Sequence, residues 1–131
     1  MHALAKQLSR SDVKTRFLWL PQAITACRLL PPLDELASNP RLETELVDPN
    51  RKAWRFVYGA YTRRIGDQAT HRYYLRDKEG YLSSMRAREG HFFELRHDAI
   101  RGLLVNCSKT LPFAWNGAGP WCFDPGGHSE G

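Results

Sequence analysis

Cysteine is scarce in this chain and its copies lie far apart, at Cys27, Cys107 and Cys122. An odd number of cysteines without a C-x-x-C pair excludes a disulfide framework and gives no zinc-ligand spacing. The chain also lacks a glycine loop followed by Lys and Ser or Thr, the signature of a phosphate-binding loop. We therefore expect reduced, mostly buried thiols and neither a metal nor a cofactor.

Long apolar runs are missing as well. No stretch approaches the roughly 18 consecutive apolar residues of a membrane helix, and polar residues such as Lys6 and Gln7 interrupt the N-terminal region where a secretory signal would need an apolar core. The sequence thus predicts a cytoplasmic protein with no membrane partner. Its 131 residues, 42% of them hydrophobic, predict a single domain over residues 1–131 with its own core.

Acidic residues are in the minority, and the basic excess is concentrated. The whole chain carries a formal charge of +5. Residues 51–101 hold twelve Lys and Arg against six Asp and Glu, whereas the remainder holds seven against eight. A basic middle in a nearly neutral frame predicts a polyanionic partner for one surface, either nucleic acid or an acidic protein.

The hydrophobic periodicity predicts an α+β fold. Apolar residues recur at three-to-four spacing over 3–30 and again over 41–47, which indicates helices within residues 1–47. From residue 53 the period changes to two, and turn signals separate four runs at 53–63, 70–76, 81–88 and 91–96. Short gaps of this kind predict a four-stranded antiparallel meander over 53–96. A helix over 98–108 and an irregular Gly/Pro/Trp-rich tail over 109–131 complete the predicted fold.

Alternation along the predicted strands separates two sheet faces. The predicted core face collects Trp54, Phe56, Tyr58, Ala60, Tyr73, Leu75, Tyr81, Met85, Ala87, Phe93 and Leu95. The opposite face is rich in arginine and aromatic rings, with Glu94 as its one acid; its candidate binding residues are Arg55, Tyr61, Arg63, Arg72, Tyr74, Arg76, Arg86, Arg88, Phe92 and Arg96.

A sheet face of this composition suits single-stranded nucleic acid, because rings stack on bases while guanidinium groups neutralise phosphates. The leading hypothesis is a small, basic, non-enzymatic protein that binds nucleic acid, preferably single-stranded, through this face. The same composition also suits a purely structural face, in which arginine stems cover apolar neighbours.

Other functions remain open. One is a protein-interaction module, such as an inhibitor or adaptor of the phage or mobile-element type, or a homodimer through the sheet. Another is a small-ligand protein or an enzyme with a pocket between sheet and helices. His71 and His91 could supply general acid–base chemistry, although alternation places both on the core side. In the tail, Trp115 and Trp121 could contact a ligand or partner.

Overall fold

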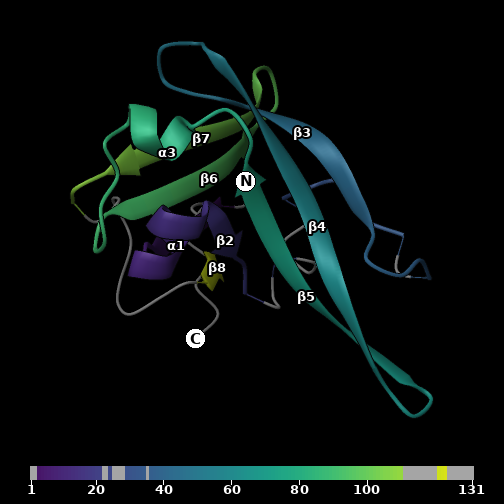
Figure 1. Ribbon diagram of the computed structural model, residues 1–131. Coiled ribbons are helices and arrows are strands. Elements are labelled where there is room, and N and C mark those ends of the chain that lie inside the picture. Colours follow the sequence, from purple (N-terminus) through teal and green to yellow (C-terminus); the bar gives the residue numbers. More distant parts are fainter. Residues whose placement is uncertain (1–2, 22–23, 25–28, 35, 111–120, 124–131) are drawn as a thin grey trace.

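The chain forms one mixed β-sheet with short helices at its margins, seen in a computed structural model that describes residues 3–21, 24, 29–34, 36–110 and the backbone of 121–123 (Figure 1). The strand order is β2-β5-β4-β3-β7-β6-β1-β8. Among these described strands, every pairing is antiparallel except that of β3 with β7. In chain order the elements are β1 (Ala3–Gln7), α1 (Arg10–Thr15), β2 (Phe17–Trp19), β3 (Arg41–Val47), β4 (Ala53–Ile65), β5 (Gln68–Asp77), α3 (Tyr81–Ser84), β6 (Phe92–Asp98), β7 (Gly102–Ser108) and β8 (Trp121–Phe123).

The α+β prediction is wrong, because most of the predicted helical region is strand. Within 3–30 the structure has β1, the short helix α1 and β2, and the predicted helix at 41–47 is β3. Strand β1 pairs with β6 on one side and β8 on the other, so it lies inside the sheet rather than at an edge. Its residues 3–6 are all buried, and continuous burial removes the alternation that marks a strand in sequence.

The predicted helix at 98–108 is also wrong. Asp98 does accept hydrogen bonds from following N–H groups, those of Ile100 and Arg101 at 2.8 Å, but they close a turn. Gly102, at φ +85°, then starts β7, which returns antiparallel to β6. An Asx turn and a helix N-cap use the same side-chain acceptor, so the sequence signal is shared by both structures.

The predicted strand at 81–88 is instead the short helix α3 and a following turn. The Asp77 carboxylate ends β5 and accepts hydrogen bonds from the N–H groups of Gly80, Tyr81 and Leu82 at 2.8–2.9 Å. Tyr81 and Leu82 are buried, whereas Met85, predicted for the core face, is 37% exposed. Four strands in a simple meander are thus replaced by a larger sheet.

The hairpin of β4 and β5 agrees with the prediction, although both strands are longer than expected. Their antiparallel register pairs ten residues from Phe56↔Asp77 to Ile65↔Gln68, and Figure 1 shows the hairpin projecting from the body. The predicted core positions on these strands, Trp54, Phe56, Tyr58, Ala60, Tyr73 and Leu75, are all buried. Alternation therefore assigned the two faces of this hairpin correctly.

The sheet curves until its two ends approach each other. Strand β2 lies at one end of the order and β1 next to the other, yet the Lys6 ammonium on β1 donates a 2.6 Å hydrogen bond to the Trp19 carbonyl on β2. The buried side chains inside this curve form one core that includes Leu4, Leu18, Phe56, Phe93 and Leu95. Among the residues that the structure describes, no helix has the length and apolar character needed to cross a membrane.

Candidate nucleic-acid interface

The outer face of the β4–β5 hairpin gathers six of the predicted binding residues on two adjacent strands. Cross-strand neighbours on this face are Tyr61 with Arg72 and Gly59 with Tyr74. Strand β2 extends the face by pairing with β5, so that Phe17 lies opposite Arg76 and Trp19 opposite Tyr74. We call this surface the arginine–aromatic face; its members are Phe17, Trp19, Arg55, Tyr61, Arg63, Arg72, Tyr74 and Arg76.

Four rings of this face pack against one another. Tyr61 and Tyr74 stack with centroids 5.1 Å apart and planes inclined by 27°. Phe17 lies 5.1 Å from Tyr74, and Trp19 lies 5.8 Å from Tyr61. Tyr74 is buried in this cluster, whereas Tyr61 keeps 47% of its surface exposed. Tyr61 is therefore an exposed ring that the other aromatic side chains of the cluster hold in place.

Glycine at position 59 makes room for the cluster. A Cβ atom built there would lie 2.5 Å from the Tyr74 hydroxyl and 2.6 Å from its Cζ. Only a residue without a side chain lets the Tyr74 ring lie flat over the neighbouring strand. Burial raises the pKa of the Tyr74 phenol, with a further contribution from Tyr61.

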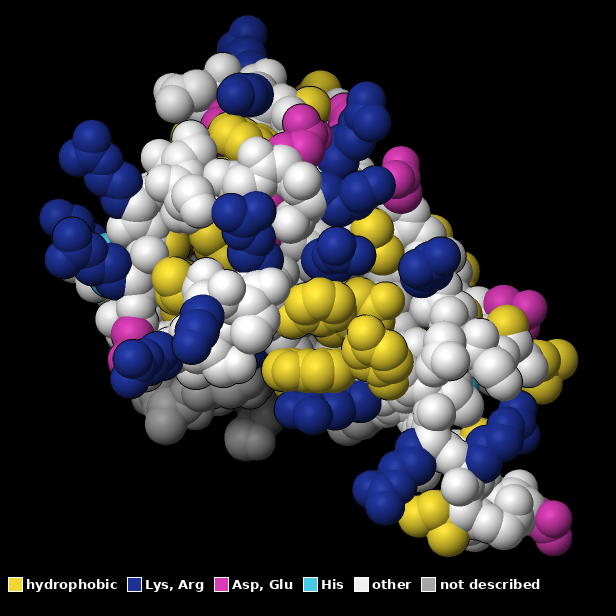
Figure 2. Space-filling view, in the orientation of Figure 1, with side chains coloured by type: hydrophobic (Ala, Val, Ile, Leu, Met, Phe, Trp, Pro, Cys, Tyr) yellow, Lys and Arg dark blue, Asp and Glu magenta, His cyan; other side chains and the backbone are white. Residues whose placement is uncertain are grey.

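Two arginines stack on the edge of the cluster. The Arg72 guanidinium carbon lies 3.7 Å from the Trp19 ring centroid, and that of Arg76 lies 5.6 Å from Phe17. Figure 2 shows the hydrophobic side chains as a patch over β2 and β5 with Lys and Arg on several sides of it. Stacking holds the guanidinium planes in place while leaving their N–H edges available to an anion.

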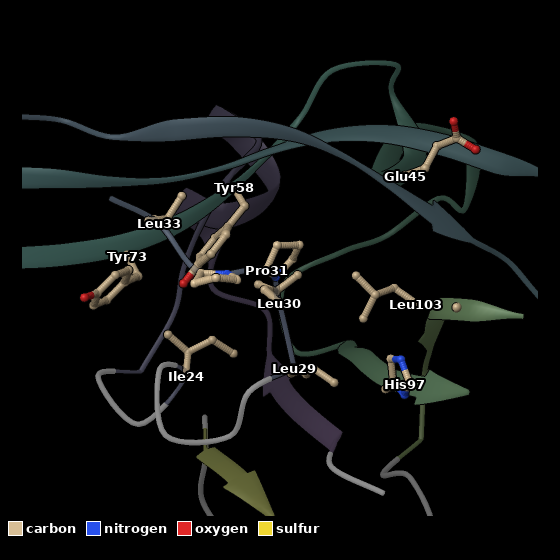
Figure 3. A pocket seen from close by; sticks show the side chains of 12 residues that line it. Ile24, Leu29, Leu30, Pro31, Leu33, Glu45, Tyr58, Tyr73, His97 and Leu103 are labelled. Atoms are coloured by element: carbon tan, nitrogen blue, oxygen red, sulfur yellow. The ribbon is translucent and has the colours of Figure 1, made fainter. Parts of the chain in front are cut away.

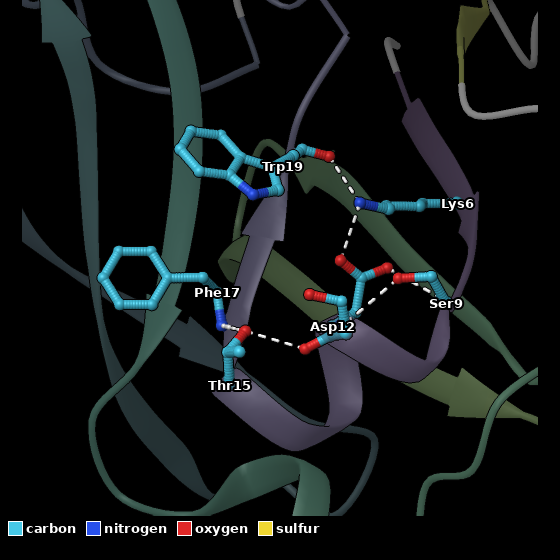
Figure 4. Close-up of polar contacts among 7 residues, drawn as sticks. Lys6, Ser9, Asp12, Thr15, Phe17 and Trp19 are labelled. Carbon is cyan, nitrogen blue, oxygen red and sulfur yellow. Dashed lines mark hydrogen bonds and ion pairs between the residues drawn. The ribbon is translucent and has the colours of Figure 1, made fainter.

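The position of Trp19 depends on a buried polar network behind the face (Figure 4). Lys6 Nζ donates hydrogen bonds to the Trp19 carbonyl and to the Asp12 carboxylate, the latter at 3.1 Å. The Asp12 carboxylate also accepts from the Ser9 N–H, and the Asp12 N–H donates to Ser9 Oγ, which completes the capping box of α1. Burial lowers the pKa of Lys6, and the nearby Arg72 adds to the effect, while Asp12 opposes it.

The cations of the arginine–aromatic face lack acidic partners. Within the described ranges, Arg55, Arg63, Arg72 and Arg76 form no ion pair with a carboxylate; the pairs present there are Lys6–Asp12, Lys78–Glu43 and Arg96–Glu94. Arg63, Arg72 and Arg76 thus lie on one surface with no described carboxylate paired to them, whereas Arg55 has Glu45 as its cross-strand neighbour on β3. Such an arrangement stabilises the complex with a polyanion more than it stabilises the free protein.

The remaining predicted binding residues lie elsewhere. Arg86 and Arg88 follow α3, and Phe92 and Arg96 lie on β6, which β4, β3 and β7 separate from β5 in the sheet. Arg96 is paired with Glu94 on that strand. The misassigned segment at 81–88 explains the difference, because the predicted meander would have left only that one strand between β5 and β6.

Of the two tail tryptophans, Trp115 lies outside the described residues. For Trp121 the structure describes only the backbone, which belongs to β8 beside β1.

The two candidate catalytic histidines are not brought together in the sheet. His71 on β5 lies 3.1 Å from the Thr62 hydroxyl through Nδ1. His91 precedes β6, and its Nδ1 accepts a hydrogen bond from the Arg88 N–H. Across the described positions, no group of three His, Cys, Asp or Glu side chains could hold a metal ion.

Phe17 and Trp19 are the members of the face that the sequence did not predict. Their spacing, with Leu18 between them, is the alternation of a half-buried strand, since Leu18 is buried and the two rings are partly exposed. This three-residue pattern was present in the sequence but lay within a longer helical periodicity.

Comparison with known proteins identifies a solved structure that shares the fold of this chain. No protein-family model matches the chain, and no curated protein does either. Among solved structures, one titled "Arabidopsis FUS3-DNA complex" aligns with a TM-score of 0.58 and 17% sequence identity, covering 82% of this chain and 96% of that one. The chain therefore shares its fold with a protein whose structure was determined in complex with DNA.

Proposed function

We propose that this protein binds nucleic acid through the arginine–aromatic face, with a preference for single strands. The observation that carries the proposal is the open Tyr61 ring, set on a pre-packed aromatic cluster and flanked by Arg63 and Arg72, neither of which is paired with a described carboxylate. No other surface predicted from the sequence combines open rings with unpaired guanidinium groups in the described residues.

Each member of the face has a physical role in this proposal. The arginines contact phosphate oxygens and release counterions, which supplies affinity that falls with salt. An aromatic ring that stacks on a base contributes about 1–3 kcal/mol, and it needs a base whose face is accessible. Bases in a duplex are stacked on one another, so the ring contribution is available in single strands and at unpaired positions.

The fold supports nucleic-acid binding in general and leaves the preference for single strands to experiment. The FUS3 structure was solved with DNA, and its fold covers most of this chain. An acidic protein partner would also suit the cationic groups, but it gives no reason for the exposed ring. Neither the fold nor the comparison supports a homodimer through the sheet.

The decisive experiment measures fluorescence anisotropy of labelled single-stranded RNA, single-stranded DNA and duplex DNA titrated with nuclease-treated protein at about 50 and 200 mM salt. We expect saturable binding with a steep salt dependence and tighter binding of single strands. Equal affinity for duplex and single strands would mean that stacking on bases does not contribute and that the protein binds only the phosphate backbone of the nucleic acid. Absence of binding at the lower salt concentration would overturn the proposal and assign the face to an acidic protein.

A further inference from the structure

Strand β3 has one edge that the rest of the described chain leaves open. Its pairing with β4 covers all of Arg41–Val47, but its pairing with β7 is a single point, Val47↔Leu104. The two strands meet only where β3 ends and β7 begins. In the residues that the structure describes, no other backbone group bonds the edge of 41–46 that faces away from β4.

The register identifies which groups lie on this edge. The Ala60 N–H donates to the Pro40 carbonyl, so position 40 faces β4 with its backbone acceptor. Along an antiparallel ladder every second residue bonds the partner strand, and the others point outward. Leu42, Thr44 and Leu46 therefore bond β4. The N–H and C=O groups of Arg41, Glu43 and Glu45 lie on the open edge.

An apolar cavity of about 740 Å³ lies beside this edge (Figure 3). Leu30, Leu33 and Tyr58 line one side of it, and Leu103 of β7 lines the opposite side. Glu45 of β3 and His97 of β6 lie at its margin near Leu103, as Figure 3 shows. Its size is within the range of pockets that bury a small molecule or a large side chain.

The end of the edge beside the cavity favours a partner of positive sign, because Glu45 lines the cavity whereas the basic Arg41 lies at the other end of β3. Glu43 is paired with Lys78, whereas Glu45 forms no ion pair with any described residue and is exposed. A peptide added beside β3 would place alternate side chains into the cavity and the others next to Glu45. Hence the edge fits an extended segment in which apolar and basic residues alternate.

We propose that the open edge of β3 is a docking site for an extended peptide of a partner protein, which adds as a strand beside β3. One apolar side chain of the peptide enters the cavity between Leu30 and Leu103, and a neighbouring Lys or Arg faces Glu45. The backbone groups of Arg41, Glu43 and Glu45 supply hydrogen bonds independent of the peptide's sequence. This site adjoins the arginine–aromatic face, because Glu45 and Arg55 are cross-strand partners. The open edge and the cavity are not part of that face, so the proposal stands whether or not the face binds nucleic acid.

The test uses a fluorescein-labelled heptapeptide in which lysine alternates with leucine or valine, and a counterpart with glutamate in place of lysine. General electrostatics would favour the glutamate peptide, because the chain carries a net charge of +5. We expect the lysine peptide to bind more tightly. On binding, amide hydrogen exchange of Arg41, Glu43 and Glu45 should slow, whereas exchange of Leu42, Thr44 and Leu46 should change little because these amides already bond β4.

Two variants locate the contact. E43P removes one edge N–H and E43A keeps it, while both lose the ion pair with Lys78; proline is tolerated on a strand edge. We expect E43P to bind the lysine peptide about fivefold more weakly than E43A, the equivalent of one hydrogen bond. L103W fills the cavity and should also weaken binding. Equal affinities of E43P and E43A, tighter binding of the glutamate peptide, or unchanged exchange at the three edge amides would each overturn the proposal.

Discussion

The Tyr74 ring lies over Gly59 so closely that its hydroxyl occupies the space of a side chain on the neighbouring strand, 2.5 Å from where a Cβ would lie. The two residues are direct cross-strand partners. Tyr74 in turn supports Tyr61 and Phe17 in the aromatic cluster. The absence of a side chain at position 59 is thus a condition for the geometry of the whole arginine–aromatic face.

Gly59→Ala should displace Tyr74 and disturb the cluster. Overpacking of this kind costs about 1–3 kcal/mol of unfolding free energy, which urea denaturation would measure. We also expect weaker binding of single-stranded oligonucleotide at protein concentrations where the variant is fully folded. A variant with wild-type stability and affinity would mean that the ring finds an equivalent position.

Tyr61→Ala removes the exposed ring and Tyr61→Phe keeps it. If the ring stacks on a base, the alanine variant should lose about 1–3 kcal/mol of binding free energy for single strands, roughly five- to 150-fold in affinity. The phenylalanine variant should bind like the wild type. Equal losses of affinity in both variants would assign the effect to the hydroxyl group. Duplex DNA is the control, because neither substitution should greatly change its affinity.

Arg63→Ala and Arg96→Ala remove the same charge from different surfaces. Arg63 belongs to the arginine–aromatic face, whereas Arg96 is bound to Glu94 on β6. We expect Arg63→Ala to reduce the slope of log affinity against log salt by about 0.7 for single strands, the value for one phosphate contact. Arg96→Ala should leave the slope unchanged. Similar effects of both changes would indicate a response to net charge alone.

Asp48 predicts a specific acid sensitivity. Burial opposes its ionisation, but hydrogen bonds from the Trp54 indole and from the Lys52 and Asn50 N–H groups outweigh burial and hold its pKa below the ordinary value. The native state therefore binds this proton more weakly than the unfolded chain. The resulting stability is present above the unfolded pKa of about 3.9 and is lost as pH falls through the native value.

Asp48→Asn should test this linkage. At neutral pH we expect a loss of about 1–3 kcal/mol of unfolding free energy, because the amide cannot accept all of the three hydrogen bonds. The difference from the wild type should begin to shrink below about pH 4, the unfolded pKa, and continue to shrink as the pH falls through the lower native pKa and the native carboxyl becomes protonated. Denaturation curves at several pH values would measure it, and a difference that stays constant with pH would contradict the assignment.

The sequence correctly predicted the regions of the fold in which each strand has one solvent-exposed face and one buried face. On β4 and β5 the alternation of residues such as Trp54, Arg55 and Phe56 follows the pleat, so the hairpin and its two faces could be derived. Six of the ten candidate binding residues lie together for the same reason. Alternation of polar and apolar residues indicates that one face of a strand is exposed and the other is buried, and the β4–β5 hairpin has this arrangement.

The remaining elements of the fold could not be predicted, because their structure depends on neighbouring strands that sequence patterns do not reveal. Strand β1 is almost continuously buried, and β2 is too short for a periodicity to outweigh the helical spacing around it. Asp77 and Asp98 each end a strand and bond the next N–H groups, but one leads into a helix and the other into a hairpin. The same local chemistry thus has two tertiary outcomes, and the sheet neighbours decide between them.

Strand β1 comes first in the chain, yet its pairing partners come last. Residues 3–7 pair with 92–96 and with 121–123, so the N-terminal strand cannot acquire either neighbour until most of the polypeptide has been synthesised. Contacts of such long sequence separation slow folding, because loop closure must precede them. The hairpin of β4 and β5 is local and can form early. We expect hydrogen exchange during refolding to protect that hairpin first and β1 last, which makes the burial of Lys6 a late event in folding.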